Sequence, residues 1–208
     1  HLLVCIMRLI VRINQTWLWF AFRLYLLLSG SDYKTYLIKK DIVKSRGYFL
    51  ASNHQSKLDP FVIGGALPFL ARIKLSPVWF IAYRELFTYG IASFFLRSFG
   101  AFPTKPIKGL SYGLEFSETA LRNQDTVCIF PEGKRTVRGA TEPRHGVSVL
   151  ANIDNVRLIP VNIEWQNGAL VKKVSIIIGK PLNAAGKTPQ KIMDIIYKLP
   201  EGGKKAVQ

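Results

Sequence analysis

The chain has 208 residues, of which 49% are hydrophobic and 20% charged, and this length accommodates one domain with a full core, alone or with an appendage. Lysine and arginine outnumber aspartate and glutamate by 29 to 13, and the net charge of +16 predicts a partner that carries phosphate. A nucleic acid is disfavoured because no groove-reading motif is present. The 13 Phe, 8 Tyr and 4 Trp residues favour an anionic membrane surface instead.

The two cysteines, Cys5 and Cys128, lie far apart in apolar surroundings, and neither belongs to a C-x-x-C motif or a Cys/His cluster. This pattern excludes a cysteine-based metal site and predicts two reduced thiols in a reducing compartment. We expect no metal site. The chain begins at His1 instead of methionine, so we expect that residues precede it in the full protein.

Residues 2–28 are mostly apolar, but Arg8, Arg12 and Arg23 interrupt them. The longest uninterrupted apolar run is well short of the roughly 20 residues that a membrane-spanning helix needs. The charge pattern and the cleavage site of a secretory signal are also absent. The segment predicts one long or two short amphipathic helices in the membrane interface. The alternative is a helix that packs on the core of the domain itself.

The remaining chain shows no internal repeat and no low-complexity linker. In chain order we expect a pair of short strands within 33–47 with a turn at Lys39–Asp41, a strand at 48–52, a helix at 59–70, a strand at 78–82, a helix at 85–99, a brief strand at 101–102, a helix at 109–123, a strand at 126–130, a helix at 146–151, strands at 158–165 and 170–179 joined by a hairpin turn at Asn167–Gly168, and a helix at 189–199. The predicted fold class is therefore α/β, a single mixed-sheet domain over residues 31–200 that is flanked by helices. An N-terminal amphipathic, membrane-associated helical segment (1–30) precedes it, and a basic flexible tail (201–208) follows.

The first candidate site is Asn53-His54-Gln55-Ser56-Lys57-Leu58-Asp59, where a buried strand gives way to a helix. A histidine can take up a proton near neutral pH, and a carboxylate on its other ring nitrogen fixes the tautomer. On one regular helix, residues five apart point about 140° apart. Pairing of His54 with Asp59 therefore requires His54 at or before the helix start and Asp59 one turn in, with Ser56 or Asn53 as a possible cap. The alternative is a capping histidine and a surface aspartate.

The second candidate site is Phe130-Pro131-Glu132-Gly133-Lys134-Arg135-Thr136, which follows another buried strand. Gly133 allows a ligand to approach the backbone, and Lys134 and Arg135 supply charge for a phosphate. Alone, the segment could equally be a solvated turn. Arg144, close behind, fits a helix start with a solvated face better than a phosphate contact.

Together these two segments resemble the conserved blocks of the glycerolipid acyltransferase family, whose best-known members are 1-acylglycerol-3-phosphate acyltransferases. The resemblance covers about residues 45–165 and includes Arg84–Phe87, Gly100–Pro103 and Leu158–Val161 in the family's order. It implies that His54 is the general base, that Asp59 orients it, and that Glu132, Gly133 and Arg135 help to bind the acceptor phosphate. The arginine expected after Gly100–Pro103 is missing, and Lys105 is the nearest candidate to replace it, while Lys134 stands where the family commonly has a hydroxyl residue.

The resemblance implies direct acyl transfer from acyl-CoA or acyl carrier protein to the hydroxyl of lysophosphatidic acid, without a cofactor. We expect no acyl-enzyme, because Cys128 lies in a strand and Ser56 is badly placed beside His54. The oxyanion would be held by backbone N–H groups near the helix start or at Gly133. Another lysolipid or glycerol 3-phosphate as acceptor, or a non-catalytic basic lipid-binding module, are the alternatives. We expect a membrane-associated protein at a cytoplasmic face, in bacteria that of the inner membrane.

Overall fold

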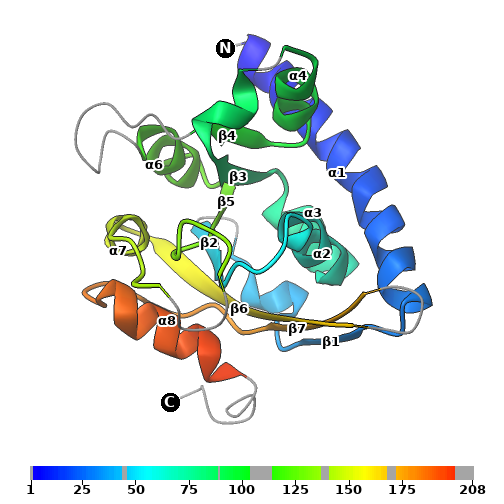
Figure 1. Cartoon of the computed structure of the whole chain (residues 1–208). Coiled ribbons are helices and arrows are strands. Elements are labelled where there is room, and N and C mark those ends of the chain that lie inside the picture. Colours follow the sequence, from blue (N-terminus) through cyan, green and yellow to red (C-terminus); the bar gives the residue numbers. More distant parts are fainter. Residues whose placement is uncertain are drawn as a thin grey trace.

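In the computed structural model, which describes residues 2–43, 46–88, 90–103, 114–136, 141–167 and 172–199, seven strands form one mixed sheet (Figure 1). The strand order is β1-β7-β6-β2-β5-β3-β4, and every neighbouring pair is parallel except β6 and β7. The strands are β1 (Asp32–Thr35), β2 (Gly47–Ser52), β3 (Val78–Ala82), β4 (Ala101–Pro103), β5 (Thr126–Ile129), β6 (Val156–Gln166) and β7 (Lys173–Ile178). The predicted fold class, a single mixed sheet flanked by helices, is confirmed.

Helices cover both faces of this sheet, with α6, α7 and α8 on one side and α2, α3 and the C-terminal half of α1 on the other (Figure 1). The central strand β2 is buried along its whole length, as a parallel strand covered on both faces must be. The helices are α1 (Leu2–Leu28), α2 (Asp59–Ala66), α3 (Phe69–Leu75), α4 (Gly90–Ser98), α6 (Glu115–Arg122), α7 (Gly146–Ala151) and α8 (Pro189–Tyr197), with short 3-10 helices η1 (Lys39–Asp41) and η2 (Arg84–Phe87).

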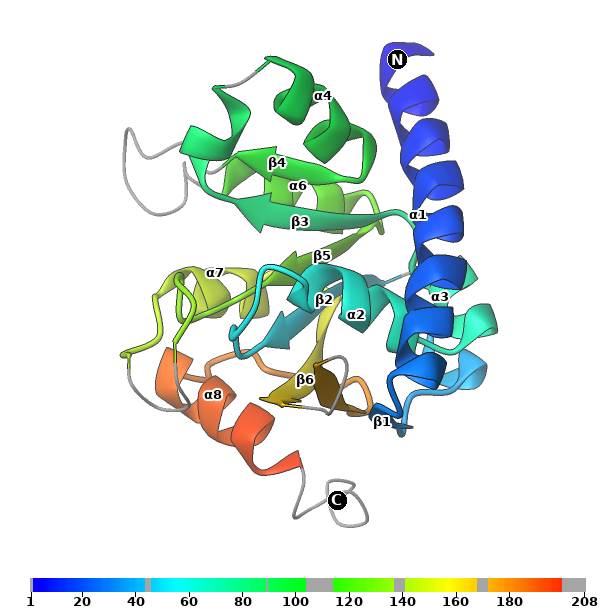
Figure 2. The ribbon, with the colours of Figure 1, turned by 45° about the vertical axis from the view of Figure 1, so that its right-hand side comes forward.

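Helix α1 is one continuous helix that runs along the outside of the domain (Figure 2). Its inner face belongs to the fold: Val11 and Leu26 are fully buried, and the indole N–H of Trp19 donates to the Leu67 carbonyl at 2.9 Å. Among the described residues, no helix has the length and apolar content needed to cross a bilayer. Its outer face nevertheless exposes many large apolar side chains, namely Ile6, Leu9, Ile10, Ile13, Trp17, Phe20, Leu24, Leu27 and Leu28.

Three expectations about individual elements were wrong. The pair of short strands expected within 33–47 is replaced by one strand, β1, which ends at Thr35 and is followed by η1 at the expected turn, and the described residues between η1 and the start of β2 at Gly47 form no second strand. The helix expected at 59–70 ends at Ala66, because Leu67 is extended before Pro68, as residues before proline tend to be. The helix expected at 85–99 is divided into η2 and α4, although its closure at Gly100, with φ of 91°, is as predicted.

Other boundaries shifted by a few residues. Helix α6 begins at Glu115, and residues 109–113 of the helix expected there lie outside the described residues. The hairpin between β6 and β7 is present as an antiparallel pair, but Gly168 of its predicted turn also lies outside them. Residues 201–208, the predicted tail, are likewise not described.

Candidate active site

The two predicted segments meet because they follow parallel neighbouring strands. Strands β2 and β5 run parallel, with Ala51 opposite Ile129. The segments that follow them therefore leave the sheet at the same edge, the C-terminal one, where open α/β sheets bind ligands. Asn53 fixes the first exit: its amide donates to the Ile163 carbonyl at 2.7 Å and accepts from the Ile163 N–H at 2.8 Å. Both segments therefore start from rigid strand ends.

His54 and Asp59 form the pair that the sequence predicts, with Nδ1 of His54 2.8 Å from Oδ2 of Asp59. His54 precedes helix α2, as the pairing required, and Asp59 is the first helical residue, earlier than expected. The helix N-cap is Leu58, so neither predicted cap is used. A carboxylate at a helix N-terminus is favoured by the dipole of the helix.

Asp59 is held by more than the imidazole. Its side chain is fully buried, and Oδ2 also accepts from the backbone N–H groups of Gln55 at 2.7 Å and Ser56 at 2.9 Å. Oδ1 accepts from the indole N–H of Trp165 at 2.7 Å. With four donors around it, the carboxylate has one fixed orientation, and it fixes the histidine ring in turn.

Glu132 is buried, at 1% exposed, and it connects the two segments. Its Oε2 accepts from the backbone N–H of His54 at 2.7 Å, while Oε1 accepts from the hydroxyls of Thr136 at 2.7 Å and Tyr197 at 2.8 Å. The backbone N–H of Thr136 donates to the His54 carbonyl at 2.8 Å. Glu132 therefore fixes the position of the His54 backbone without lining the cavity itself.

The ring of His54 stacks on Phe130, with centroids 4.1 Å apart and planes 24° apart. The histidine side chain is 18% exposed and lines a cavity of about 940 Å³. Because Nδ1 faces Asp59, Nε2 is the nitrogen that remains for a substrate. The site can therefore accept a proton from a group bound in the cavity.

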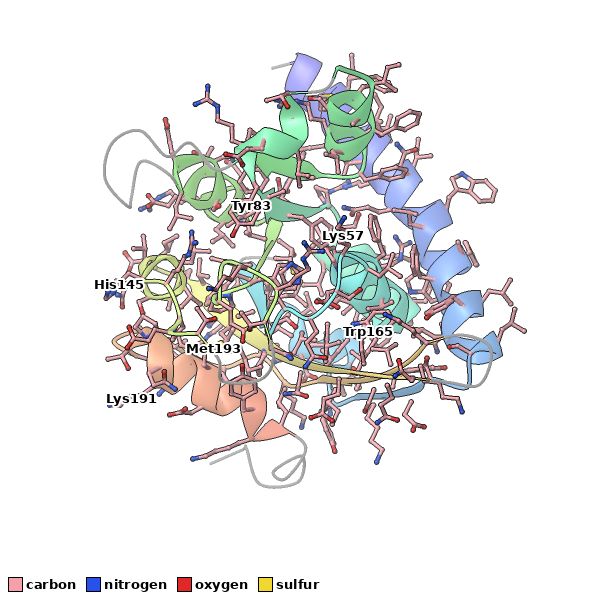
Figure 3. All side chains as sticks on the ribbon, viewed as in Figure 1. Lys57, Tyr83, His145, Trp165, Lys191 and Met193 are labelled. Atoms are coloured by element: carbon pink, nitrogen blue, oxygen red, sulfur yellow. The ribbon has the colours of Figure 1, made fainter. Side chains whose placement is uncertain are left out.

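The cavity has a cationic rim and an apolar interior. Lys57, Lys134, Arg135 and Arg144 line the rim and are all exposed. Lys57, just before α2, and Tyr83, just after β3, both line this cavity and are labelled in Figure 3. Large apolar side chains line the interior, among them Leu18, Trp19, Phe61, Ile63, Leu67, Val78, Phe80, Leu86, Leu96, Phe99, Leu114 and Ile129. A ligand with a phosphate and a long hydrocarbon chain matches both parts.

Gly133 gives the rim its shape. Its φ of 65° lies in the left-handed region that favours glycine. The side chain of Arg144 occupies the space where a Cβ of residue 133 would lie. The hydroxyl of Tyr83 donates to the Gly133 carbonyl, which ties this turn to the segment after β3.

The structure brings together His54, Asp59, Glu132, Gly133, Lys134 and Arg135, while Lys105 lies outside the described residues. Glu132 is separated from the cavity lining, since it bonds to the backbone behind His54. Roles for Lys57, Tyr83, Trp165 and Tyr197 were not predicted from the sequence. Arg144 is exposed just before α7, as predicted, and it also lines the cavity. For Lys57, the position inside the first motif was a usable signal.

Comparison with known proteins gives a consistent result. A family model described as "Acyltransferase" matches residues 35–164, which contain both segments. The crystal structure of the 1-acyl-sn-glycerophosphate (LPA) acyltransferase PlsC from Thermotoga maritima has a similar fold, with a TM-score of 0.56 and 21% identity. The likeness covers 93% of this chain and 74% of that one.

Curated relatives carry related names. A "Probable 1-acyl-sn-glycerol-3-phosphate acyltransferase" from Mycoplasma pneumoniae is 25% identical over 160 residues, which are 72% of this chain and 56% of the relative. The 1-acyl-sn-glycerol-3-phosphate acyltransferase of Bacillus subtilis is 27% identical over 152 residues, covering 71% of this chain and 72% of that protein. The chain thus spans little more than half the length of the Mycoplasma relative.

Proposed function

This chain belongs to the Acyltransferase family, and on that basis we propose that it moves a fatty acyl group from an acyl thioester to the hydroxyl of 1-acylglycerol 3-phosphate, giving phosphatidic acid. The observation that carries the proposal is the His54–Asp59 pair at the polar end of a largely apolar cavity with a cationic rim. The names of the Mycoplasma and Bacillus relatives support the choice of acceptor.

The chemistry is a direct transfer. The acceptor hydroxyl lies at Nε2 of His54, which takes its proton as the oxygen forms a bond to the thioester carbonyl carbon. The resulting imidazolium faces the Asp59 carboxylate, which stabilises it. When the tetrahedral intermediate collapses, the carbon–sulfur bond breaks and His54 returns the proton to the leaving thiolate. No cofactor takes part in these steps.

The oxyanion of the intermediate needs hydrogen-bond donors. The backbone N–H groups of Gln55 and Ser56 already donate to Asp59, and that of Gly133 donates to the Phe130 carbonyl at 2.9 Å. The donors first expected from the sequence are thus occupied. We propose that a cationic side chain of the rim supplies the interaction, and Lys57 is the candidate nearest to His54 along the chain.

The phosphate of the acceptor is proposed to bind at the rim. Arg135 and Arg144 both line it, and a guanidinium can bind phosphate through two parallel hydrogen bonds. Lys134 adds charge, and Lys105 stays a predicted contributor. Glu132 is proposed to position His54 instead of binding the phosphate. The hydrocarbon chain then enters the apolar interior, which removes it from water.

The outer face of α1 suggests how the protein reaches its lipid substrate. We propose that its exposed apolar side chains, together with the net charge of +16, hold the protein on an anionic membrane surface. The corresponding location is the cytoplasmic face, where acyl-CoA or acyl carrier protein is at hand. In a bacterium this is the inner membrane.

An acceptor screen with a labelled acyl thioester tests the proposal. We expect product from lysophosphatidic acid with the wild-type chain and a loss of at least about 1000-fold with His54→Ala. Asp59→Asn should lose a comparable factor, because an amide cannot accept all four hydrogen bonds. His145→Ala is the control, since His145 is exposed at the start of α7 (Figure 3).

The same screen separates the alternatives. If glycerol 3-phosphate or another lysolipid is acylated faster than lysophosphatidic acid, that compound is the acceptor and the proposed mechanism still holds. Acylation of lysophosphatidic acid by His54→Ala at near the wild-type rate would refute the mechanism. Tight lipid binding without turnover of any acceptor would point to a non-catalytic lipid-binding module.

A further inference from the structure

A second cavity of about 500 Å³ lies at the opposite edge of the sheet from His54. It is lined at the beginnings of strands, by Arg46 before β2, Ser76 before β3 and Asp125 before β5, and by side chains of α1 and α3. His54 lies beyond the other end of β2, a strand of six residues that each extend it by about 3.3 Å. The two cavities share Arg72 in their linings. No other described residue appears in both linings, so the second cavity is a separate site.

The charge of the second cavity is strongly positive. Five cationic side chains line it against a single carboxylate, that of Asp125. Arg8 pairs with Asp125 at 2.9 Å, and Lys74 donates to the Lys39 and Ile42 carbonyls at 3.1 and 2.7 Å. The remaining cations are Arg12, Arg46 and Arg72.

Arg72 is the buried member of this set, at 6% exposed. Its Nη1 donates to the Thr16 hydroxyl at 3.3 Å, and its guanidinium carbon lies 5.9 Å from the ring centroid of Trp19 and 5.5 Å from that of Phe69. Its Nε has no partner, and no carboxylate pairs with it among the described residues. Burial lowers the pKa of Arg72, which reflects the cost of a cation without an anion nearby.

A second buried atom without a partner lies in the same lining, the hydroxyl of Ser76. Buried polar atoms in proteins are nearly always hydrogen-bonded, so two unpaired ones in residues that line one cationic cavity favour an anionic ligand there. The ligand must accept hydrogen bonds and carry negative charge, and a phosphate group does both.

We propose that this cavity binds a phosphate group, carried by a phospholipid head or present as a free anion. The surroundings favour the lipid, because Leu9 and Ile13, the neighbours of Arg8 and Arg12 on α1, and Ile73 on the cavity lining are exposed apolar side chains. A hydrocarbon chain attached to the phosphate would cover them. The site does not depend on acyl transfer, since its lining contains neither His54 nor Asp59.

Binding of inorganic phosphate to the full chain, measured by calorimetry at fixed ionic strength, forms one arm of the test. The other is sedimentation with phosphatidylcholine vesicles that contain phosphatidylglycerol. Arg12→Gln/Arg46→Gln removes two cations whose side chains are at least partly exposed, so folding should persist, as circular dichroism will show. We expect the affinity to fall about tenfold or more in at least one arm.

Two charge-matched controls locate the effect. Lys180→Gln/Lys191→Gln removes two exposed cations elsewhere, with Lys191 on the outside of α8 (Figure 3). Lys134→Gln/Arg135→Gln removes two at the rim of the first cavity. The Lys180/Lys191 control should retain the affinity within about threefold if binding is at the second cavity, and the Lys134/Arg135 variant measures the separate share of binding at the proposed phosphate site of the first cavity.

Each outcome decides the question. A loss with inorganic phosphate identifies a free anion as a sufficient ligand, and a loss confined to the vesicles identifies the lipid head group. If the Arg12/Arg46 variant binds as well as the Lys180/Lys191 control in both arms, or if both lose equally, the proposal is wrong. A failure here leaves acyl transfer untouched, because the assay measures binding alone.

Discussion

The carboxylate of Glu132 accepts a hydrogen bond of 2.7 Å from the backbone N–H of His54, although 78 positions separate them. The carboxylate is buried and its other oxygen accepts from the hydroxyls of Thr136 and Tyr197. Both oxygens of the carboxylate thus accept hydrogen bonds from the protein itself, which leaves little capacity to bind a substrate. We infer that Glu132 acts on catalysis through the position of His54.

Glu132→Gln tests this positioning role. The side-chain amide of glutamine would place its N–H group opposite groups that donate to Glu132. The buried groups left without a partner would lower the free energy of unfolding by about 1–3 kcal/mol. We expect kcat to fall about 10- to 100-fold, since a small displacement of the base is enough, while the acceptor KM stays within about threefold. Glu115→Gln on the exposed side of α6 is the control. A raised acceptor KM with unchanged kcat would instead show direct phosphate binding by Glu132.

Gly133→Ala tests how the rim is built. The left-handed φ costs about 1–2 kcal/mol for a residue with a Cβ, and the new methyl group would displace the Arg144 side chain. We expect the acceptor KM to rise about tenfold, as it should in Arg144→Ala, with little change in kcat.

The double variant Gly133→Ala/Arg144→Ala sharpens the test. Because the methyl group acts by moving Arg144, the two effects on KM should not add, and a thermodynamic cycle from steady-state kinetics measures this coupling. Additive effects would mean that Gly133 and Arg144 contribute separately. An unchanged KM in Arg144→Ala would remove this arginine from the proposed phosphate site.

The sequence predicted His54 and Asp59 because both lie in one short segment whose spacing restricts the geometry. The same reasoning could not find Trp165 or Tyr197, whose bonds to Asp59 and Glu132 span 106 and 65 positions. Such contacts depend on strand register: β6 lies beside β2 with Val161 opposite Ser52, and this brings Trp165 past the end of β2 to Asp59. Residue patterns within one element carry no information on register between elements.

The helices show a similar limit. The sequence located most helical regions, but the helix expected at 59–70 covered only the first two residues of α3, which follows Pro68, and the sequence did not show that η2 and α4 are distinct. For α1, periodicity predicted an amphipathic helix but left its two possible partners open. The structure shows that the inner face packs on the domain, while the outer face remains exposed.

The two cysteines should differ sharply in reactivity. Cys5 is exposed, whereas Cys128 is fully buried in β5, where burial raises the pKa of its thiol. We expect iodoacetamide to modify Cys5 in the native protein and Cys128 only after denaturation, as read by mass spectrometry. Modification of native Cys128 at a rate near that of Cys5 would contradict its burial in the sheet.

The raised pKa of Cys128 also has a consequence for stability. Because the folded pKa exceeds the unfolded value near 8.5, the contribution of this thiol is fully present below about pH 8.5 and is lost as the pH rises above it. The free energy of unfolding should therefore fall more steeply above about pH 9 in the wild-type chain than in Cys128→Ala. Urea unfolding at several pH values measures the difference, and parallel curves would contradict the prediction.

The outer face of α1 should be tested by point substitution, because the helix cannot be removed without consequence. Deleting it would uncover the core around Val11 and Leu26, so a loss of membrane binding could reflect unfolding. Trp17 avoids this problem, since it is 73% exposed on the outer face. An interfacial tryptophan buries roughly 150–250 Å². At about 25 cal/mol per Å², even part of that area is worth a tenfold change in affinity.

We therefore expect Trp17→Asp to weaken sedimentation with anionic vesicles about 10- to 100-fold, and Trp17→Ala to weaken it less, because alanine loses area without adding a charge. Ala185→Asp adds the same charge to an exposed turn before α8 and should bind as the wild type does. Thermal unfolding of all three variants shows whether the fold is intact. If Trp17→Asp and Ala185→Asp bind vesicles equally well, the outer face of α1 does not contact the membrane, and the positive charge of the chain must act through another surface.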